Sequence, residues 1–150
     1  MLIKRLTVNS LNIDRFEKKY DLVLPQDYID FLTQYNGGVS QDNSFVSLSS
    51  AEISIEIDTL FGIGVKEEWL SVEYWMDKYH SMLPHNSVII GCDLLKGLFI
   101  LIFDGSNDGV YYWDSMLNCQ KSTEDSNAYF LCKSFNEFIV RIGGIQLTEL

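Results

Sequence analysis

The stretch Leu24-Pro-Gln-Asp-Tyr-Ile-Asp-Phe-Leu-Thr-Gln-Tyr-Asn-Gly-Gly38 decides the fold, because it contains the start, the buried face and the end of one helix. Pro25 suits the first helical position, where its missing N–H is not needed. Asn36-Gly37-Gly38 predicts the end, since Gly and Asn adopt the left-handed conformation at low cost. Between them, apolar residues recur at helical spacing, namely Tyr28, Phe31, Leu32 and Tyr35.

Two further helices are predicted on either side of a region rich in strand patterns. Ser10 can cap a first helix, in which an apolar stripe is formed by Ile13, Phe16 and Tyr20. From Glu67 to Leu83 the apolar residues again fit one helical face, with glutamates near the favourable N-terminal end. Pro84 predicts the end of that helix.

Two groups of strands are predicted from apolar patterns. Residues 45–48 can pair with the next segment, where isoleucine stands at every second position from 53 to 57 with polar residues between. If the isoleucines face the core, Glu56 and Asp58 face outward together, because neighbouring side chains in a strand point to opposite faces. Short loops join the next strands, which predicts an antiparallel meander of residues 88–92, 98–103 and 110–113.

The end of the chain predicts a last helix with its own start and stop. Ser134 and Glu137 have the spacing of a capping box, and Gly143-Gly144 predicts the end. Because helices come first and last and the strands lie between them, the order favours an α+β fold with an antiparallel sheet flanked by helices at both ends of the chain. A chain of 150 residues without repeats or Ser/Pro-rich linkers predicts a single domain over residues 1–150.

The helix of residues 24–38 also carries a resemblance to a known family. Its sequence resembles the signature of the SUKH superfamily, the Smi/Knr-type proteins. The resemblance covers nearly the whole chain and implies the SUKH fold, which agrees with the α+β class. Further segments resemble the family's other landmarks in the expected order: a Pro-led strand ending in Gly91-Cys-Asp93, Gly97 with the apolar strand after it, the segment Val110 to Asp114, and a closing helix from Ser134.

The net charge of −10 is unevenly distributed along the chain. Residues 1–20 carry five basic and two acidic residues, a net of +3, whereas residues 21–118 carry three basic and fifteen acidic residues, a net of −12. An acidic field repels phosphate backbones and attracts basic proteins, so direct nucleic-acid binding is not expected. The alternative is that the acidity only keeps a small protein in solution.

Cysteine count and hydropathy indicate the cellular context. Cys92, Cys119 and Cys132 are an odd number without the C-x-x-C spacing of zinc or redox sites, so reduced thiols are expected. The stretch before Lys4-Arg5 is too short for the core of a signal peptide, and no apolar run is long enough for a membrane span. We therefore expect a cytoplasmic protein with no membrane partner, and the sequence leaves its oligomeric state open.

Two patterns resemble parts of metal sites. Residues 104–109, Asp-Gly-Ser-Asn-Asp-Gly, match the opening of a calcium loop, but Ser115 stands where the bidentate glutamate should be. Asp-Gly between two apolar strands is a strong hairpin signal, so a turn is favoured. His80 and His85 have a proline between them and no third nearby ligand, which favours a helix-end and a loop histidine over a zinc site. No metal and no cofactor is expected.

Catalysis is not expected, because the chain has neither a G-x-S-x-G nucleophile elbow nor a Gly-rich phosphate loop after a strand. Two alternatives stay open: a Cys-His pair assembled in space, and a hydrolase or small-ligand site built on a carboxylate cluster of Asp93, Asp104, Asp108 and Asp114. Such aspartates more often make turns. The three tryptophans fall on periodic apolar faces, which predicts core or half-core positions for Trp69, Trp75 and Trp113.

For a bacterial chain of this size, the SUKH resemblance implies an immunity protein that binds and neutralises a toxin, commonly a nuclease of a polymorphic or contact-dependent system, without catalysis. A nuclease is often basic, so an acidic inhibitor gains electrostatic steering. The alternative is a regulatory protein-interaction scaffold, as in fungal members linked to control of cell-wall synthesis. The candidate partner-binding residues are Tyr111, as an aromatic anchor, and the acidic positions expected to face outward, Asp42, Glu56, Asp58, Glu67, Glu68, Asp93 and Asp114.

Overall fold

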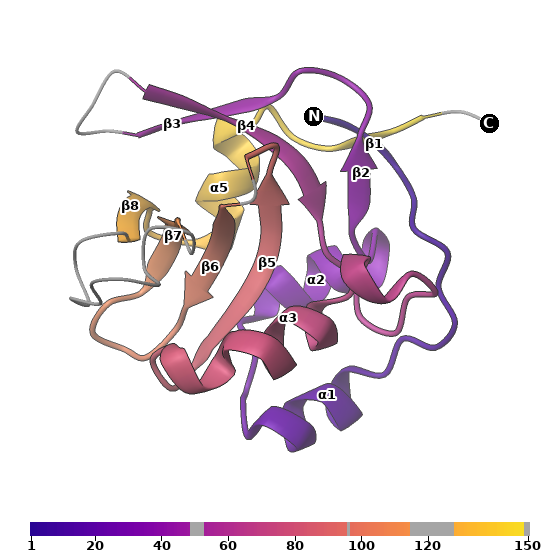
Figure 1. Ribbon diagram of the computed structural model, residues 1–150, viewed down its shortest axis with the longest axis vertical. Coiled ribbons are helices and arrows are strands. Elements are labelled where there is room, and N and C mark those ends of the chain that lie inside the picture. The colour runs from indigo at the N-terminus through magenta and orange to yellow at the C-terminus, as the bar shows by residue number, and fades with distance from the viewer. Residues whose placement is uncertain (49–52, 96, 115–127, 149–150) are drawn as a thin grey trace.

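A computed structural model describes residues 1–48, 53–95, 97–114 and 128–148 of the chain. Its centre is a mostly antiparallel sheet of nine strands in the order β8-β7-β6-β5-β4-β2-β1-β9, with β3 paired to β4 (Figure 1). The strands are β1 (Leu2–Lys4), β2 (Gly38–Ser40), β3 (Phe45–Leu48), β4 (Ile53–Leu60), β5 (Ser87–Asp93), β6 (Leu98–Ile102), β7 (Gly109–Trp113), β8 (Ala128–Cys132) and β9 (Gln146–Leu147).

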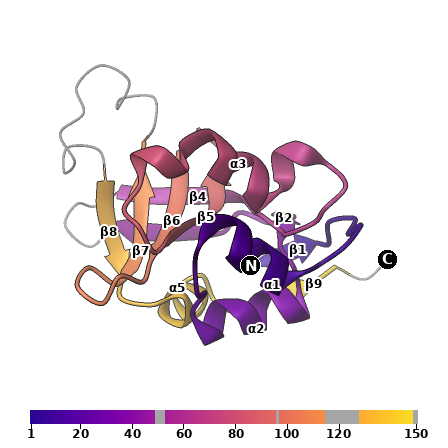
Figure 2. The same ribbon diagram turned by 90° about the horizontal axis from the view of Figure 1, so that it is seen from below.

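Helices cover both faces of this sheet, which confirms the α+β class. Helix α3 lies on one face, whereas α2 and α5 lie on the other (Figure 2). Helix α1 lies at one end of the sheet, next to α3 (Figure 1). The helices and 3-10 turns are α1 (Ile13–Tyr20), α2 (Gln26–Gln34), η1 (Glu68–Leu70), α3 (Val72–Tyr79), η2 (His80–Met82) and α5 (Phe135–Arg141). None of the helices in the described ranges is long and apolar enough to cross a bilayer.

Helix α2 forms where the sequence predicts it, with Tyr28, Phe31 and Leu32 buried on one face. Its first helical residue is Gln26, so the predicted start was one residue early. Pro25 has extended backbone angles and its carbonyl accepts from the N–H of Ile29 at 3.0 Å. The end matches the prediction: Asn36 and Gly37 both have positive φ, and a Cβ on Gly37 would lie 2.6 Å from the carbonyl oxygen of Leu60.

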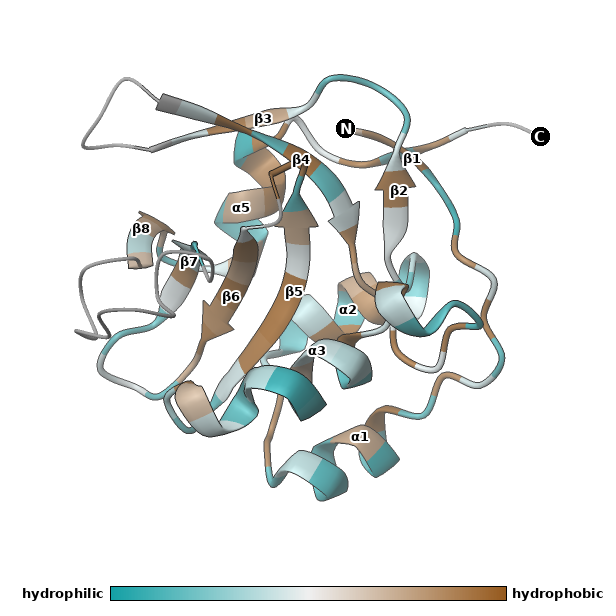
Figure 3. Ribbon diagram, in the orientation of Figure 1, coloured by the Kyte–Doolittle hydropathy of each residue, from teal (hydrophilic) through white to brown (hydrophobic). Residues whose placement is uncertain are grey.

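The core between the sheet and the α2–α5 layer is built largely from aromatic rings. The Phe135 ring lies 5.0 Å from that of Tyr28 and 5.1 Å from that of Phe31, measured between ring centroids. Phe138 packs against Phe99 of β6 at 5.5 Å. The central strands β5 and β6 are apolar along most of their length (Figure 3), because both of their faces are covered.

The predicted meander is confirmed, since β5, β6 and β7 pair antiparallel in chain order and β8 continues the series. The last helix is also confirmed. The Ser134 hydroxyl accepts from the N–H of Glu137 at 3.0 Å, although the Glu137 carboxylate accepts from Lys133 rather than from the N–H of Ser134. The helix ends at Arg141 and is followed by Gly143 and Gly144, which both have positive φ.

The sheet is not wholly antiparallel, because its first and last strands pair in parallel. The register places Leu2 beside Gln146 and Ile3 beside Leu147. The ammonium of Met1 donates to the carbonyl oxygens of Gly144 at 2.8 Å and Ile142 at 3.2 Å. These strands have only two or three residues, too few for a period-two pattern to stand out in the sequence.

Two predicted features of the helices were wrong. Asn12, not Ser10, caps α1: its side chain accepts from the N–H of Arg15 at 3.0 Å, while the N–H of Ser10 donates to Gly64. The helix predicted from Glu67 to Leu83 is interrupted at Ser71. Ser71 has an extended backbone because the residues on either side of it bond to Gly62. The N–H of Gly62 donates to the carbonyl of Leu70 at 3.1 Å, and the N–H of Val72 donates to the carbonyl of Gly62 at 2.8 Å.

The interruption at Ser71 also changes the position of one tryptophan. Trp75 stacks on Phe61 at 5.4 Å and Trp113 is 5% exposed, as predicted. Trp69 is 61% exposed, so its predicted core position was wrong. It belongs to η1, outside the apolar stripe of α3, and its backbone carbonyl accepts from the Trp75 indole N–H at 2.9 Å.

Candidate partner interface

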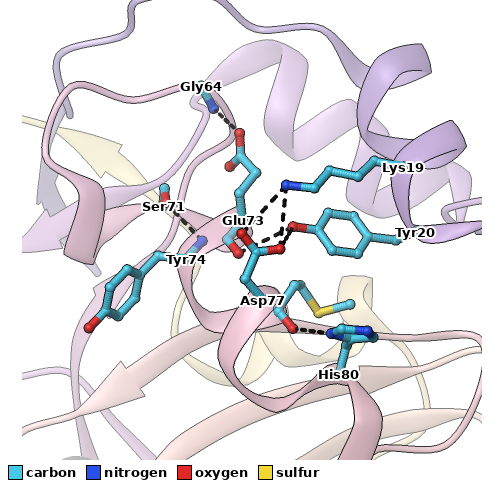
Figure 4. Close-up of polar contacts among 9 residues, drawn as sticks. Lys19, Tyr20, Gly64, Ser71, Glu73, Tyr74, Asp77 and His80 are labelled. Atoms are coloured by element: carbon cyan, nitrogen blue, oxygen red, sulfur yellow. Dashed lines mark hydrogen bonds and ion pairs between the residues drawn. The ribbon is translucent and has the colours of Figure 1, made fainter.

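Helices α1 and α3 meet through polar side chains (Figure 4). The Tyr20 hydroxyl lies 2.5 Å from Asp77 Oδ1 and 3.2 Å from the carbonyl oxygen of Glu73. Burial, and then the hydrogen bond to Asp77, raise the pKa of Tyr20 above its ordinary value. Lys19 Nζ lies 3.4 Å from the Asp77 carboxylate, with both side chains more than half exposed. Asp77 therefore serves the attachment of α1 to α3.

Glu73 lies deeper in the same junction. Its Oε2 accepts from the N–H of Gly64 at 2.9 Å, while its Oε1 is buried and has no hydrogen-bond partner among the described residues (Figure 4). The hydroxyl of Tyr28 is likewise buried and unpaired. Burial is the main cause that raises the pKa of Tyr28, and the charge of Glu73 adds to it. The charge of Glu73 on α3 therefore reaches the buried hydroxyl of Tyr28 on α2.

Glu67 and Glu68 lie on either side of the start of η1, next to the exposed Trp69. Glu68 is exposed and Glu67 is half-buried. The turn itself is fixed, because the N–H of Leu70 donates to Glu67 and the N–H of Ser71 donates to Glu68, each at 3.0 Å. This segment therefore presents a large aromatic side chain beside two carboxylates on a well-defined backbone.

Asp42 lies in the turn between β2 and β3. Its Oδ1 accepts from the Ser44 hydroxyl at 2.7 Å, and its Oδ2 accepts from the N–H of Leu2 at 3.1 Å. The hydrogen bond from Ser44 is the largest cause that lowers the pKa of Asp42, and the bond from Leu2 adds to it. Asp42 is exposed, but its carboxylate also holds the turn against β1.

Asp93 does not face outward as expected. It is 5% exposed, and its carboxylate accepts from the N–H of Gly97 at 2.6 Å and from the Tyr112 hydroxyl at 2.8 Å. Burial is the largest cause that raises the pKa of Tyr112, followed by the hydrogen bond to Asp93. The Asp93 carboxylate closes the turn between β5 and β6, so we remove it from the partner-binding candidates.

The remaining carboxylates of this sheet end are half-buried at the surface. Burial raises the pKa of the Cys92 thiol to about 12, and the charges of Asp58 and Asp93 add to this effect. Asp114 contributes in the same way to the raised pKa of Tyr112. Asp58 also accepts from the Thr59 hydroxyl at 2.9 Å. Glu56 lies two residues before it on β4. The structure thus brings Asp58, Asp93 and Asp114 to one end of the sheet.

The segment 104–109 is the predicted turn, here between β6 and β7. Asp104 Oδ1 accepts from the N–H groups of Asn107 at 2.6 Å and Ser106 at 2.9 Å, which lower the pKa of Asp104. Asp108 accepts from the N–H of Gly105 at 2.7 Å. The Tyr111 hydroxyl donates to the carbonyl of Asn107 at 2.9 Å. Tyr111, the predicted aromatic anchor, is therefore beside this turn.

The predicted carboxylate cluster does not assemble as one site. Leu98, at the start of β6, is close to the Asp93 end, whereas Asp104 follows the other end of the same strand. At about 3.3 Å per residue, the five residues of β6 separate Asp93 from Asp104 by roughly 15 Å. The hydrolase alternative, which needed both ends together, is therefore not supported by this arrangement.

Cys92 lies beside the carboxylates of Asp58 and Asp93, whereas His80 contacts the end of α3. His80 Nδ1 lies 2.8 Å from the carbonyl oxygen of Met76, and His85 is exposed. Cys92 and Cys132 are free thiols, and Cys119 falls outside the described ranges. Within the described part of the chain, no three His, Cys, Asp or Glu side chains are grouped so that they would hold a metal ion.

A scan against protein-family models matches residues 7–141 to the SMI1 / KNR4 family (SUKH-1). The chain belongs to this family. The match includes α1, α2 and α3, strands β2 to β8 and α5, and leaves out only β1 and β9 among the described elements. No curated protein and no solved structure matched the chain in the other two comparisons.

Membership of the SMI1 / KNR4 family confirms the resemblance drawn from the motifs. It supports a SUKH-domain or immunity-like role, in which binding to another protein matters more than catalysis. The α1–α3 and α2–α5 junctions are largely occupied by contacts within the domain, so surface side chains outside them are the candidates for recognition.

Sequence reasoning missed four exposed aromatic side chains. Trp69 is 61%, Phe45 47%, Phe130 46% and Tyr129 39% exposed. The signal for Trp69 was Ser71, a cap residue whose presence allows the helix to begin after the tryptophan. Phe130 and Tyr129 belong to β8, and the uncharged segment Ala-Tyr-Phe-Leu-Cys at 128–132 was its only signal.

Proposed function

We propose that this SMI1 / KNR4 family protein is an immunity protein that binds a basic protein toxin and neutralises it by covering its active surface. The observation that carries the proposal is the acidic surface. Residues 21–118 have a net charge of −12, and Asp42, Glu56, Asp58, Glu67, Glu68 and Asp114 are all exposed or half-buried rather than enclosed in the core.

The physical reason for a basic partner is electrostatic complementarity. An acidic surface attracts a positively charged protein over about a Debye length, roughly 8 Å at physiological salt, and raises the rate of productive encounters. A nuclease toxin fits this requirement, because it carries positive charge to approach phosphates. The same field disfavours direct binding of nucleic acid by this chain.

Neutralisation by occlusion requires only a stable complex. A specific interface buries about 1,200–2,000 Å² in total, which is about 600–1,000 Å² on this chain, whose whole accessible surface is 8538 Å². The acidic positions are spread over β4, η1, the β2–β3 turn and the residue after β7. We expect a subset to contact the partner and the others to act through their charge.

Co-expression tests this proposal. The chain would be produced together with the C-terminal domain of the protein encoded immediately upstream, and growth and co-purification would be scored. We expect growth rescue and a one-to-one complex whose association slows markedly between 50 and 500 mM NaCl. A domain that remains toxic and elutes separately from this chain would contradict the proposal for that partner.

A variant that removes charge without changing side-chain size sharpens the test. Glu67→Gln/Glu68→Gln removes two carboxylates at η1 while it keeps their size, and we expect slower association by about two- to tenfold with folding unchanged. Asp14→Asn removes one exposed carboxylate on α1, in the basic first part of the chain, and serves as the control. An equal change per removed charge in the two variants would show that only total charge matters.

A further inference from the structure

Tyr111 of β7 and Phe130 of β8 form an aromatic pair on the sheet face that carries α3. They are register partners, and their rings lie 5.4 Å apart at 73°. Trp113, two residues beyond Tyr111 and therefore on the same face, packs against Tyr79 of α3 at 5.2 Å. Phe130 is 46% exposed and Tyr111 is half-buried, so the pair reaches the surface beside α3.

Both rings are held in position before any partner binds. The hydroxyl of Tyr111 donates to the carbonyl of Asn107 at 2.9 Å. The ring of Phe130 lies over Gly109, where a Cβ would approach Phe130 Cε1 to 2.7 Å. Side chains that are already ordered lose little conformational entropy on association, which favours them as anchors.

The composition of β8 is unusual for the last strand of a sheet. Strand β8 ends the strand order, and among the described residues only β7 pairs with it. Strands at the edge of a sheet usually carry charged residues, especially lysine, or proline, which discourage pairing with another chain. Residues 128–132 contain neither a charged residue nor a proline. Exposing about half of an aromatic ring there does not help the domain to fold, so contact with another molecule is its simplest explanation.

The aromatic pair is bordered by negative charge. Asp104 and Asp108 lie in the turn that contacts the Tyr111 hydroxyl. Besides burial, both carboxylates raise the pKa of Tyr111, so their field reaches its ring. Arginine and lysine satisfy both features at once, because they stack on aromatic faces and pair with carboxylates.

We propose that the Tyr111–Phe130 pair and the Asp104–Asp108 turn form a docking surface for an arginine- or lysine-bearing segment of a protein partner. This inference rests on the proposed function and assigns it a place on the molecule. The competing surface is the one around Trp69, which is more exposed. In the sequence Lys66 directly precedes Glu67 and Glu68, so the charge of that segment is more balanced.

The first experiment measures affinity for the partner domain, made inactive and identified by growth rescue. We expect Phe130→Ala to weaken binding by at least about tenfold, and Asp108→Asn by about threefold with a smaller salt dependence. Leu95→Ala, at an 83% exposed position in the β5–β6 turn, and Asp14→Asn serve as matched controls, with changes below about twofold. Urea unfolding of each variant separates lost binding from lost folding.

Three outcomes overturn the docking surface while leaving the immunity role intact. Binding within about twofold of the unmodified protein in both Phe130→Ala and Asp108→Asn would do so. So would a loss of binding in Trp69→Ala alone. A change of the free protein from dimer to monomer in Phe130→Ala, seen by analytical ultracentrifugation, would instead assign this face to a second copy of the chain.

A second experiment does not depend on the toxin. Acetyl-Arg-Gly-Arg-amide would be titrated into the ¹⁵N-labelled protein, with acetyl-Glu-Gly-Glu-amide as control. We expect amide shifts concentrated between residues 104 and 111 and around Phe130 for the arginine peptide only. Shifts confined to other acidic positions, or equal shifts with both peptides, would overturn the inference even if the toxin complex forms.

Discussion

The junction between α2 and α5 differs from the junction between α1 and α3 in the side chains that fill it. In the first, the rings of Tyr28, Phe31 and Phe135 lie within 5.0 to 6.1 Å of one another and are almost wholly buried. In the second, Tyr20 and Lys19 reach Asp77 across a surface that remains partly exposed to water. We therefore expect the α2–α5 junction to set the stability of the domain and the α1–α3 junction to adjust it.

The physical reason is that the two kinds of contact contribute different amounts to the free energy of unfolding. Burial of an aromatic ring removes a large apolar area from water, and no solvent molecule competes for that contact. A hydrogen bond or ion pair at a partly exposed position replaces hydrogen bonds to water by contacts with a protein group, so its net contribution to stability is small. Substitutions in the two junctions should therefore differ in size and, for one pair of tyrosines, in sign.

The largest effect is expected from Phe135→Ala. Phe135 is 2% exposed and its ring is packed between Tyr28 and Phe31, so truncation leaves a cavity. We expect the free energy of unfolding to fall by about 3–5 kcal/mol, measured by urea denaturation. Val140→Ala on the same helix, at a 68% exposed position, should change it by less than about 0.5 kcal/mol. Similar losses in both would show that the contribution of α5 to stability does not come from its buried face.

Tyr20→Phe should have a smaller effect. It removes the hydroxyl that bonds to Asp77 and leaves the ring contact with Phe16 at 4.8 Å. We expect a loss of about 1–2 kcal/mol, reduced from the usual strength of a charge-assisted hydrogen bond because Asp77 is exposed. A loss as large as that of Phe135→Ala would remove the contrast between the two junctions.

Alkaline pH provides a second measurement of the Tyr20 contact. The folded pKa of Tyr20 is raised, so the stability that it contributes is fully present below the unfolded pKa of about 10 and is lost as the pH rises above it. We expect the stability difference between the unmodified protein and Tyr20→Phe to narrow from pH 8 to pH 11. A constant difference over that range would mean that folding does not raise the pKa of Tyr20.

Tyr28→Phe should have the opposite sign. The hydroxyl of Tyr28 is buried and has no hydrogen-bond partner among the described residues, and removal of such a group takes away a desolvation cost. We expect the free energy of unfolding to stay unchanged or to rise by up to about 1 kcal/mol. A decrease of more than about 1 kcal/mol would indicate that a buried water joins this hydroxyl to the unpaired oxygen of Glu73.

The smallest effect is expected from Lys19→Ala. Lys19 lies 3.4 Å from Asp77, and the two side chains are 55% and 56% exposed. We expect a loss of no more than about 0.5 kcal/mol, which disappears at 1 M NaCl because salt screens exposed charges. Lys18→Ala, at another exposed lysine of α1, serves as the comparison for the general effect of one positive charge. An effect of Lys19→Ala that persists in high salt would point to the contact of its ammonium with the Tyr20 ring, 5.1 Å from the ring centroid.

Local patterns predicted the helices and the meander well where both ends and one face were encoded close together. α2, α5 and strands β5 to β7 are of this kind. The patterns failed where a residue serves a distant partner. Ser71 interrupts a helical stripe because its neighbours bond to Gly62, and Asp93 turns inward because Tyr112 and Gly97 bond to its carboxylate.

The sequence by itself determined the family, the α+β class and the concentration of negative charge in residues 21–118, because each depends on residue types and their spacing along the chain. Only the tertiary structure decided which side chains meet. It placed Asp104 at the opposite end of β6 from Asp93, exposed Trp69, and brought Phe130 beside Tyr111. Such contacts join residues that are far apart in the chain, and strand order and register, which no short pattern encodes, bring them together.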